Sequence, residues 1–157
     1  ESDFIDTSLE GWRVALEISA YSFIHLAKHA VPLMEEKGGA MLALTYMASQ
    51  RVVPKYNVMG IAKSALEASV RYLAYDLGKQ GVRVNTLTLG GVFNEQPEAF
   101  LEAYCERVPM GRMADARELG GAVLFLASDA SASCTGGDFP IDGGNTAGKR
   151  VRGAPGA

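Results

Sequence analysis

The sequence predicts an α/β fold with a parallel sheet, because helical and strand patterns alternate along its 157 residues with short links. Two segments, 40–46 and 82–89, have strand character, and each follows a segment whose apolar residues recur at helical spacing. The length suits one domain. We therefore expect the two strands to lie side by side, with the helices at about 8–34 and 56–77 on one side of them.

The first helix is expected at about 8–34. Thr7-Ser8-Leu9-Glu10 has the form of a capping box, and Pro32 lies near the end of the helical pattern. The apolar residues at spacings of three and four are Leu9, Trp12, Leu16, Ala20, Phe23 and Ala27. The run AMLALTY at 40–46 is nearly continuously apolar, which is typical of a strand covered on both faces of a parallel sheet.

The second helix is expected from about Tyr56 to Leu77, closed by the glycines of 78–81. The next segment, VRVNTLTL at 82–89, alternates and is rich in Val, Thr and Leu, as strands are. The segment 94–109 is polar and turn-rich at first, and we expect a helix in its later part.

A second capping-box pattern, Asp115 to Glu118, precedes an apolar stretch and predicts a helix at about 115–128. Phe139-Pro140-Ile141 is expected to be a last short strand, and the Gly143-Gly144 pair after it a structural turn. The tail from Gly148 combines Gly, Pro and basic residues and is expected to be disordered. The predicted organisation is one domain over 1–147 and a tail over 148–157.

The composition excludes several classes of protein. Lys plus Arg number 15 against 18 Asp plus Glu, for a net charge of −3, which argues against a nucleic-acid binder. No apolar run approaches the ~18 residues that a membrane span needs. Cys105 and Cys134 are too few for a disulfide framework, and nothing at the start resembles a signal peptide. We expect a cytoplasmic protein.

The stretch from Tyr46 to Lys63 carries the candidate chemistry. If Tyr56 begins the helix, Lys63 lies seven residues on and leaves from nearly the same face, two turns away. A phenol beside an ammonium is a proton donor whose phenolate is stabilised by the neighbouring charge. Tyr46 ends the preceding strand, at the edge where open α/β sheets bind ligands. By spacing alone, an interface aromatic and a solvated cation are the commoner explanation for such a pair.

His25 and His29 are four residues apart on the first predicted helix and could present two nitrogens to one metal ion. No carboxylate or third His at ligand spacing accompanies them. We therefore predict no metal site, and we expect these histidines on a helix surface or at an interface.

Four motifs stand out: ISAYSF at 18–23, LTY at 44–46, YNVMGIAKSALEASVRY at 56–72 and GVRVN at 81–85. On these motifs the sequence resembles the short-chain dehydrogenase/reductase family and, within it, the bacterial enoyl-(acyl-carrier-protein) reductases. The wider family places its catalytic Tyr four residues before the Lys and a Ser thirteen before that Tyr, where this chain has Met59 and Tyr46. The enoyl reductase branch instead has a Tyr seven before the Lys and a second Tyr at the strand end, which matches Tyr56 and Tyr46.

The resemblance implies a Rossmann-like, doubly wound parallel sheet, of which this chain covers the C-terminal part. It implies that Tyr56 stabilises or protonates the enolate oxygen formed when hydride reaches the β-carbon of an enoyl thioester. Tyr46 would line the substrate pocket and orient the thioester, and Met59 would pack beside the substrate. The implied cofactor-binding residues are Lys63 at the nicotinamide ribose, with Gly91, Val92, Phe93 and Asn94 after the second strand.

The implied cofactor is NAD, with NADH favoured over NADPH, and the implied partner is an acyl thioester on acyl carrier protein or another small-molecule substrate. The two long helices imply a homodimer or homotetramer. The family's glycine-rich phosphate turn has no counterpart in this chain. Two alternatives stay open: a short-chain dehydrogenase acting on an alcohol, ketone or sugar, or a non-catalytic fragment without its cofactor half.

Overall fold

The computed structural model describes residues 3–148 and contains a parallel sheet of three strands in the order β1-β2-β3. The strands are β1 (Gly39–Tyr46), β2 (Val82–Leu89) and β3 (Asp138–Ile141). β1 and β2 pair in parallel along their whole length, so that the two strand ends, Tyr46 and Leu89, are partners. The predicted α/β fold and the predicted pairing of its two main strands are confirmed.

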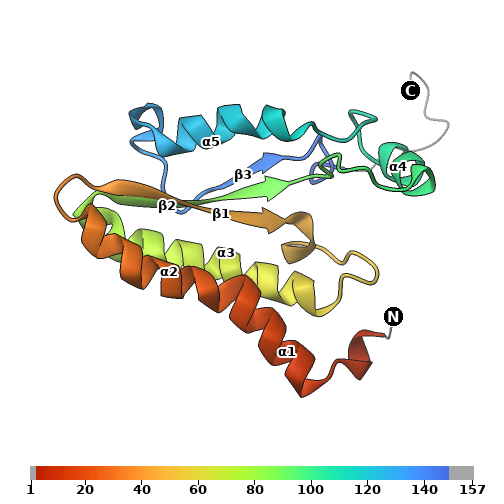
Figure 1. Ribbon diagram of the computed structural model, residues 1–157, viewed down its shortest axis with the longest axis horizontal. Helices are drawn as coiled ribbons and strands as arrows, with labels where there is room; N and C mark the ends of the chain where they lie inside the picture. The colour runs from red at the N-terminus through yellow and green to blue at the C-terminus, as the bar shows by residue number, and fades with distance from the viewer. Residues whose placement is uncertain (1–2, 149–157) are drawn as a thin grey trace.

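Helices cover the two faces of the sheet unequally (Figure 1). One face carries α1 (Leu9–Leu16), α2 (Ser22–Ala30) and α3 (Val58–Leu77), and the other carries α5 (Gly120–Ala127). α4 (Glu98–Cys105) lies beyond the carboxyl ends of the strands. The two long helical segments lie on one side of the sheet, as predicted.

The first helical segment is continuous from 9 to 34 but changes its winding. A π-helical turn, Glu17–Tyr21, joins α1 to α2, and a 3-10 turn, Val31–Met34, ends the segment. The capping box predicted from Thr7 is wrong. Ser8 is the N-cap and accepts a hydrogen bond from the Gly11 amide at 3.0 Å, while the Thr7 hydroxyl donates to the Phe4 carbonyl. The helix therefore begins one residue later than that box would place it.

The second capping box is present as predicted. Asp115 accepts from the Arg117 amide at 2.8 Å, and Glu118 accepts from the Asp115 amide at 2.7 Å. The helix that follows starts as a 3-10 turn, Ala116–Leu119, and continues as α5.

The remaining expectations mostly hold. The segment 94–109 contains α4, and the short strand at 139–141 lies within β3. The Gly143-Gly144 turn has φ angles of 64° and 87°, a conformation that glycine adopts without strain. The tail predicted to be disordered, 148–157, lies outside the described residues except for Gly148, whose amide donates to the Gly144 carbonyl at 3.2 Å. Among residues 3–148, no helix is both long and apolar enough to cross a membrane.

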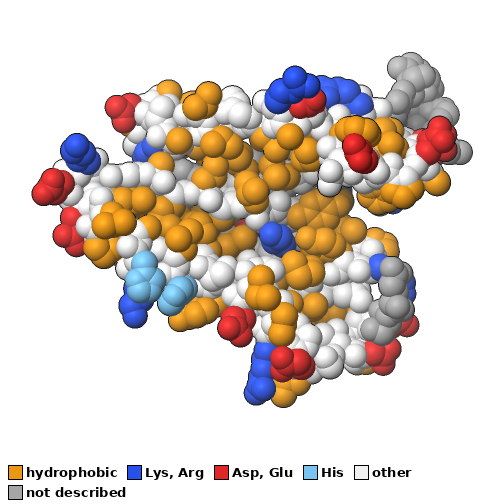
Figure 2. All heavy atoms as spheres, in the orientation of Figure 1, with side chains coloured by type: hydrophobic (Ala, Val, Ile, Leu, Met, Phe, Trp, Pro, Cys, Tyr) orange, Lys and Arg blue, Asp and Glu red, His pale blue; other side chains and the backbone are white. Residues whose placement is uncertain are grey.

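The core lies between the sheet and the α1–α3 layer. Its members from the sheet are Met41, Ala43, Val82 and Val84, and its members from the helices are Ala20, Ala27, Leu66, Val70 and Ala74. Alanines from the first helical segment let that segment approach α3 closely. On the opposite face the cover is incomplete: Leu44 and Leu124 are exposed, and Figure 2 shows hydrophobic side chains gathered between α5 and the helices below it.

Thr45 and Glu67 form a buried polar contact between β1 and α3, with 3% and 9% of their surfaces exposed. The Thr45 hydroxyl donates to Glu67 Oε1 at 2.6 Å. Thr45→Val keeps the shape but leaves the buried carboxylate without this donor, so we expect a loss of about 1–3 kcal/mol in the free energy of unfolding, measured with urea. The control is Thr45→Val with Glu67→Leu, which should recover much of the loss. A single variant as stable as the parent would contradict this account.

Candidate active site

Two tyrosines, one at the end of β1 and one in the loop that leads to α3, lie in contact. Tyr46 is the last residue of β1, and Tyr56 lies in the turn before α3. Their ring centroids are 5.0 Å apart and their planes are tilted by 56°. The pair therefore lies at the carboxyl edge of the parallel sheet, where α/β proteins bind their ligands.

α3 begins at Val58, two residues later than the predicted start, so Tyr56 lies outside the helix. Both neighbours of Tyr56 have left-handed backbones, with φ of 66° at Lys55 and 46° at Asn57. Residues other than glycine adopt a positive φ only with backbone strain. Such residues are found more often at functional sites. Tyr56 is therefore placed by a strained turn and by its contact with Tyr46, and its direction does not follow from a helical face shared with Lys63.

Lys63 reaches back to the end of β1. Its ammonium donates to the carbonyl oxygen of Leu44 at 2.9 Å, and burial lowers its pKa from the usual 10.5. Burial raises the pKa of Tyr56 above its usual 10.0. Stabilisation of a Tyr56 phenolate by Lys63 stays a prediction, and desolvation of the phenol acts against it. Tyr56 is a neutral hydrogen-bond donor at physiological pH.

Tyr46 is also neutral, although it has charged neighbours. Burial raises its pKa most, the phenols of Tyr104 and Tyr56 raise it further, and the guanidinium groups of Arg107 and Arg51 lower it. The site thus presents two protonated phenols side by side. Such a pair can donate hydrogen bonds to an oxygen that becomes negative during a reaction.

These opposite shifts predict which group ends activity at high pH. Burial raises the pKa of both phenols and lowers the pKa of Lys63, so burial favours loss of the Lys63 proton over loss of a phenol proton. We expect the alkaline limb of the kcat/KM profile to follow Lys63, and Lys63→Arg to move it to higher pH because a guanidinium does not deprotonate. Tyr46→Phe serves as the control and should leave the limb in place. A limb that vanishes in Tyr46→Phe and stays in Lys63→Arg would assign it to the phenol.

The loop 51–54 borders two cavities. The first, of ≈ 420 Å³, is lined by Tyr56 and by residues from the start of α3, including Gly60 and Ser64. The second, of ≈ 400 Å³, is lined by Tyr46 and by residues beyond the strand ends. Those residues include Gly90, Gly91, Gln96, Phe100, Tyr104 and Arg107. The reacting group of a ligand in either cavity could reach the tyrosine pair.

The segment after β2 is held in place by hydrogen bonds. The Phe93 amide donates to the Ala114 carbonyl, and the Ala114 amide donates to the Gly91 carbonyl, both at 2.9 Å. The Gln96 side chain donates to the Val92 carbonyl at 2.8 Å and accepts from the Asn94 amide at 2.7 Å. Of the four residues predicted here to bind a cofactor, Gly91 lines the Tyr46 cavity, and the other three extend from it as a fixed loop.

Met59 follows Tyr56 closely, and its amide donates to the Tyr56 carbonyl at 3.1 Å. Met59 packs on the first helical segment, where the Ser19 hydroxyl lies 3.9 Å from its sulfur. The rings of His25 and His29 meet edge to face with centroids 4.7 Å apart. In the described part of the chain, no three His, Cys, Asp or Glu side chains are grouped as metal ligands.

Sequence reasoning missed Arg51, Tyr104 and Arg107, which line the Tyr46 cavity. Arg51 lies inside the stretch that carried the candidate chemistry, and its guanidinium donates to the Asn145 carbonyl. Tyr104 and Arg107 are three residues apart at the end of a predicted helix, so helical spacing could have placed them on one face. Nothing in the sequence indicated which face would meet Tyr46.

Comparison with known proteins gives one consistent family. The family model described as enoyl-(acyl carrier protein) reductase matches residues 1–146. The enoyl-(acyl-carrier-protein) reductase (NADH) of Aquifex aeolicus is 42% identical over 146 residues, which are 89% of this chain and 54% of that protein. The corresponding Bacillus cereus enzyme is also 42% identical, over 92% of this chain and 58% of its own length. The chain thus spans little more than half the length of these relatives.

Solved structures that resemble this chain belong to the same family. The Anaplasma phagocytophilum reductase in complex with NAD superposes with a TM-score of 0.89 at 41% identity, over 99% of this chain and 60% of that one. A Bacillus cereus reductase with NADP+ and indole naphthyridinone gives 0.86 at 40% identity, over 94% and 59%. The likeness in fold and sequence extends over the tyrosine pair and the loop after β2 alike. The chain belongs to the enoyl-(acyl carrier protein) reductase family.

Proposed function

We propose that this chain carries the catalytic part of an NADH-dependent reductase that reduces the double bond of an enoyl thioester on acyl carrier protein, a step of fatty acid synthesis. The observation that carries the proposal is the contact of Tyr46 and Tyr56 at the carboxyl end of β1, with ring centroids 5.0 Å apart. The relatives named as NADH-dependent reductases support the choice of reaction and of cofactor.

The residues present fit the nicotinamide end of the dinucleotide. Gly90 and Gly91 line the cavity just after the end of β2, and the Lys63 ammonium reaches the Leu44 carbonyl near the end of the neighbouring strand β1. The loop of Val92, Phe93 and Asn94 would continue this side of the site, where the Val92 carbonyl accepts from the Gln96 side chain. When bound, reduced nicotinamide supplies the hydride.

The tyrosines act on the thioester oxygen. As the β-carbon gains hydride, negative charge develops on this oxygen, and the Tyr56 hydroxyl donates a hydrogen bond to it. Tyr46 contacts Tyr56 and orients the thioester from the strand side. Burial keeps both phenols protonated, so both remain donors at physiological pH. Met59 acts by packing that supports the first turn of α3.

The proposed reaction is tested by measuring NADH oxidation by the catalytically active form of the protein. Crotonyl thioester is compared with a panel of ketones as substrates. We expect kcat/KM for crotonyl thioester to exceed that for every ketone by at least ~10²-fold. The ketones lack a conjugated double bond whose β-carbon could accept the hydride. A ketone that exceeds the thioester would favour a carbonyl reductase, and NADPH in a parallel arm tests the cofactor.

We further propose that the protein is a homodimer or homotetramer formed through its helical face. Tyr72 and Tyr75 on α3 are 75% and 87% exposed, and Ile18 and Leu26 on the first helical segment are exposed beside them in the same layer. A patch of this extent is more typical of an interface than of a monomer surface. Sedimentation should show an oligomer that Tyr72→Glu with Tyr75→Glu dissociates. A parent protein that sediments as a monomer would refute the interface.

A further inference from the structure

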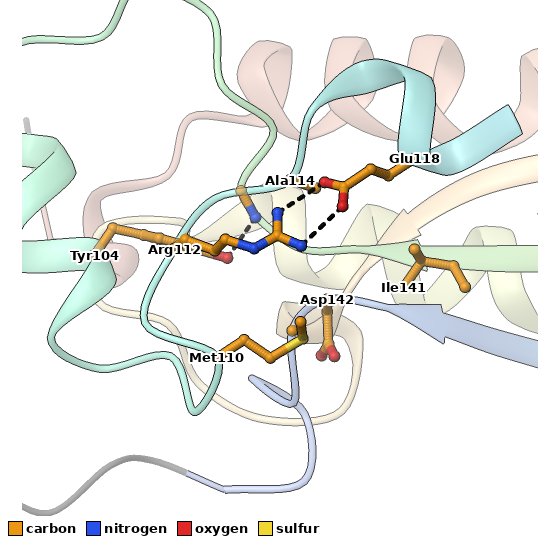
Figure 3. Close-up of a pocket in the computed structure, with 9 residues that line it drawn as sticks. Tyr104, Met110, Arg112, Ala114, Glu118, Ile141 and Asp142 are labelled. Carbon is orange, nitrogen blue, oxygen red and sulfur yellow. Dashed lines mark hydrogen bonds and ion pairs between the residues drawn. The ribbon is translucent and has the colours of Figure 1, made fainter. Parts of the chain in front are cut away.

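Tyr104 separates two cavities at the carboxyl ends of β2 and β3. Tyr104 and Gly91 line the ≈ 400 Å³ cavity that contains Tyr46. The same two residues line a second cavity of ≈ 180 Å³, together with Met110 and Ile141 (Figure 3). The Tyr104 side chain is therefore the wall that both cavities share.

The ring is fixed in this position. The Gly91 amide donates to the Tyr104 hydroxyl, and a Cβ added at Gly91 would lie 2.7 Å from the ring carbon Cζ. Because real Cβ contacts do not become so short, glycine is required where the ring lies. On its other side Tyr104 stacks with Phe100, with centroids 6.4 Å apart and planes 25° apart. The wall is thus held by a backbone group and by a second ring.

The second cavity suits an alkyl chain. Arg112 donates two hydrogen bonds of 2.8 Å to Glu118, and these hold the pKa of Glu118 at about 2, so the pair stays ionised and neutralises itself. The Asp142 carboxylate accepts hydrogen bonds from backbone amides of its own turn. The remaining lining includes the apolar side chains of Met110 and Ile141. No lining cation is therefore left to select an anionic ligand.

We infer that Tyr104 determines the length of the acyl chain that the site accepts. The inference rests on the proposed enoyl reduction. With the thioester at the tyrosine pair, the acyl chain extends through the Tyr46 cavity and ends against the Tyr104 ring. Removing the ring joins the two cavities, so a longer chain gains buried surface while a short chain gains none.

The test compares butyryl and dodecanoyl thioesters in calorimetric binding, and crotonyl and dodecenoyl thioesters in kcat/KM. Tyr104→Ala should raise the long-to-short ratio by about tenfold or more, since a few newly buried methylenes supply that factor. Tyr104→Phe keeps the ring and is the matched control, with the ratio unchanged. Adding Met110→Trp to Tyr104→Ala fills the second cavity and should return the ratio to the parent value.

The inference fails if Tyr104→Ala, folded by circular dichroism, keeps the parent ratio, or if the parent binds neither thioester. A gain for the long chain that Met110→Trp does not reverse would also overturn it, because the second cavity would not be the space gained. Failure of the proposed function would give a different result. The ratio of long-chain to short-chain thioester affinity would change in the variants as expected, but no enoyl thioester would be reduced with NADH. Should Tyr104→Ala not fold, Tyr104→Leu removes the ring with a smaller loss of volume and carries the same expectation.

Discussion

Replacing Tyr56 by Phe is expected to lower kcat by about 10²–10³-fold, with little change in cofactor affinity. The loss corresponds to removing one donor from an oxyanion site. Tyr56 is the phenol that the strained turn between Lys55 and Asn57 holds against Tyr46, and burial keeps it protonated. Steady-state kinetics with crotonyl thioester and NADH measures the effect.

Three further variants separate the roles around Tyr56. Tyr46→Phe should cost less and act partly through substrate KM, because Tyr46 orients the thioester from the strand end. Lys63→Ala should raise the cofactor KM as well as lower kcat. Met59→Leu should keep a near-normal rate, because Met59 packs on the first helical segment. A Tyr56→Phe enzyme with undiminished kcat would end the assignment of Tyr56.

Gly60→Ala is expected to destabilise the protein by about 1–3 kcal/mol and to lower activity with it. A Cβ at Gly60 would lie 2.9 Å from the backbone carbonyl oxygen of Ala48, two residues after Tyr46. Intrinsic helix propensity alone would favour Ala by about 1 kcal/mol, so the sign of the change reports the packing. The carbonyl cannot rotate away as a side chain could, and the start of α3 must move away from the strand end.

Gly78→Ala is the matched control for this change. Gly78 follows α3, has an ordinary helical φ of −57°, and a Cβ there would meet no atom within 4 Å. We expect it to be neutral or to stabilise by about 0.4–1 kcal/mol in urea denaturation. If Gly60→Ala were as harmless as Gly78→Ala, the close approach of α3 to the strand end would be refuted.

The elements of this fold were predictable because each has a local cause. The apolar run at 40–46 and the alternation at 82–89 predict β1 and β2 within one residue, and the Asp115–Glu118 capping box is present as its pattern implies. The first capping pattern failed because Thr7 and Ser8 are both good caps. The Thr7 hydroxyl bonds to the Phe4 carbonyl, which leaves the cap to Ser8.

The site was predictable in its residues and less so in its geometry. The spacing of Tyr46, Tyr56 and Lys63 matched a motif, but a helical face for Tyr56 assumed regular backbone where two residues are left-handed. The direction of Lys63 toward the Leu44 carbonyl depends on how α3 packs on β1. The contact of Tyr104 with Gly91 joins a helix to a strand end through a loop, and no period in the sequence encodes such a contact.

We propose that these residues hold the nicotinamide end of the cofactor beside the tyrosine pair. The most direct test of this placement is an NMR titration of the 157-residue chain with reduced nicotinamide mononucleotide and, separately, with adenosine monophosphate. We predict that the nicotinamide compound shifts the ring signals of Tyr46 and Tyr56, assigned through Tyr46→Phe and Tyr56→Phe, and that the adenosine compound does not. Shifts of these rings by adenosine monophosphate, without shifts by the nicotinamide compound, would contradict the account.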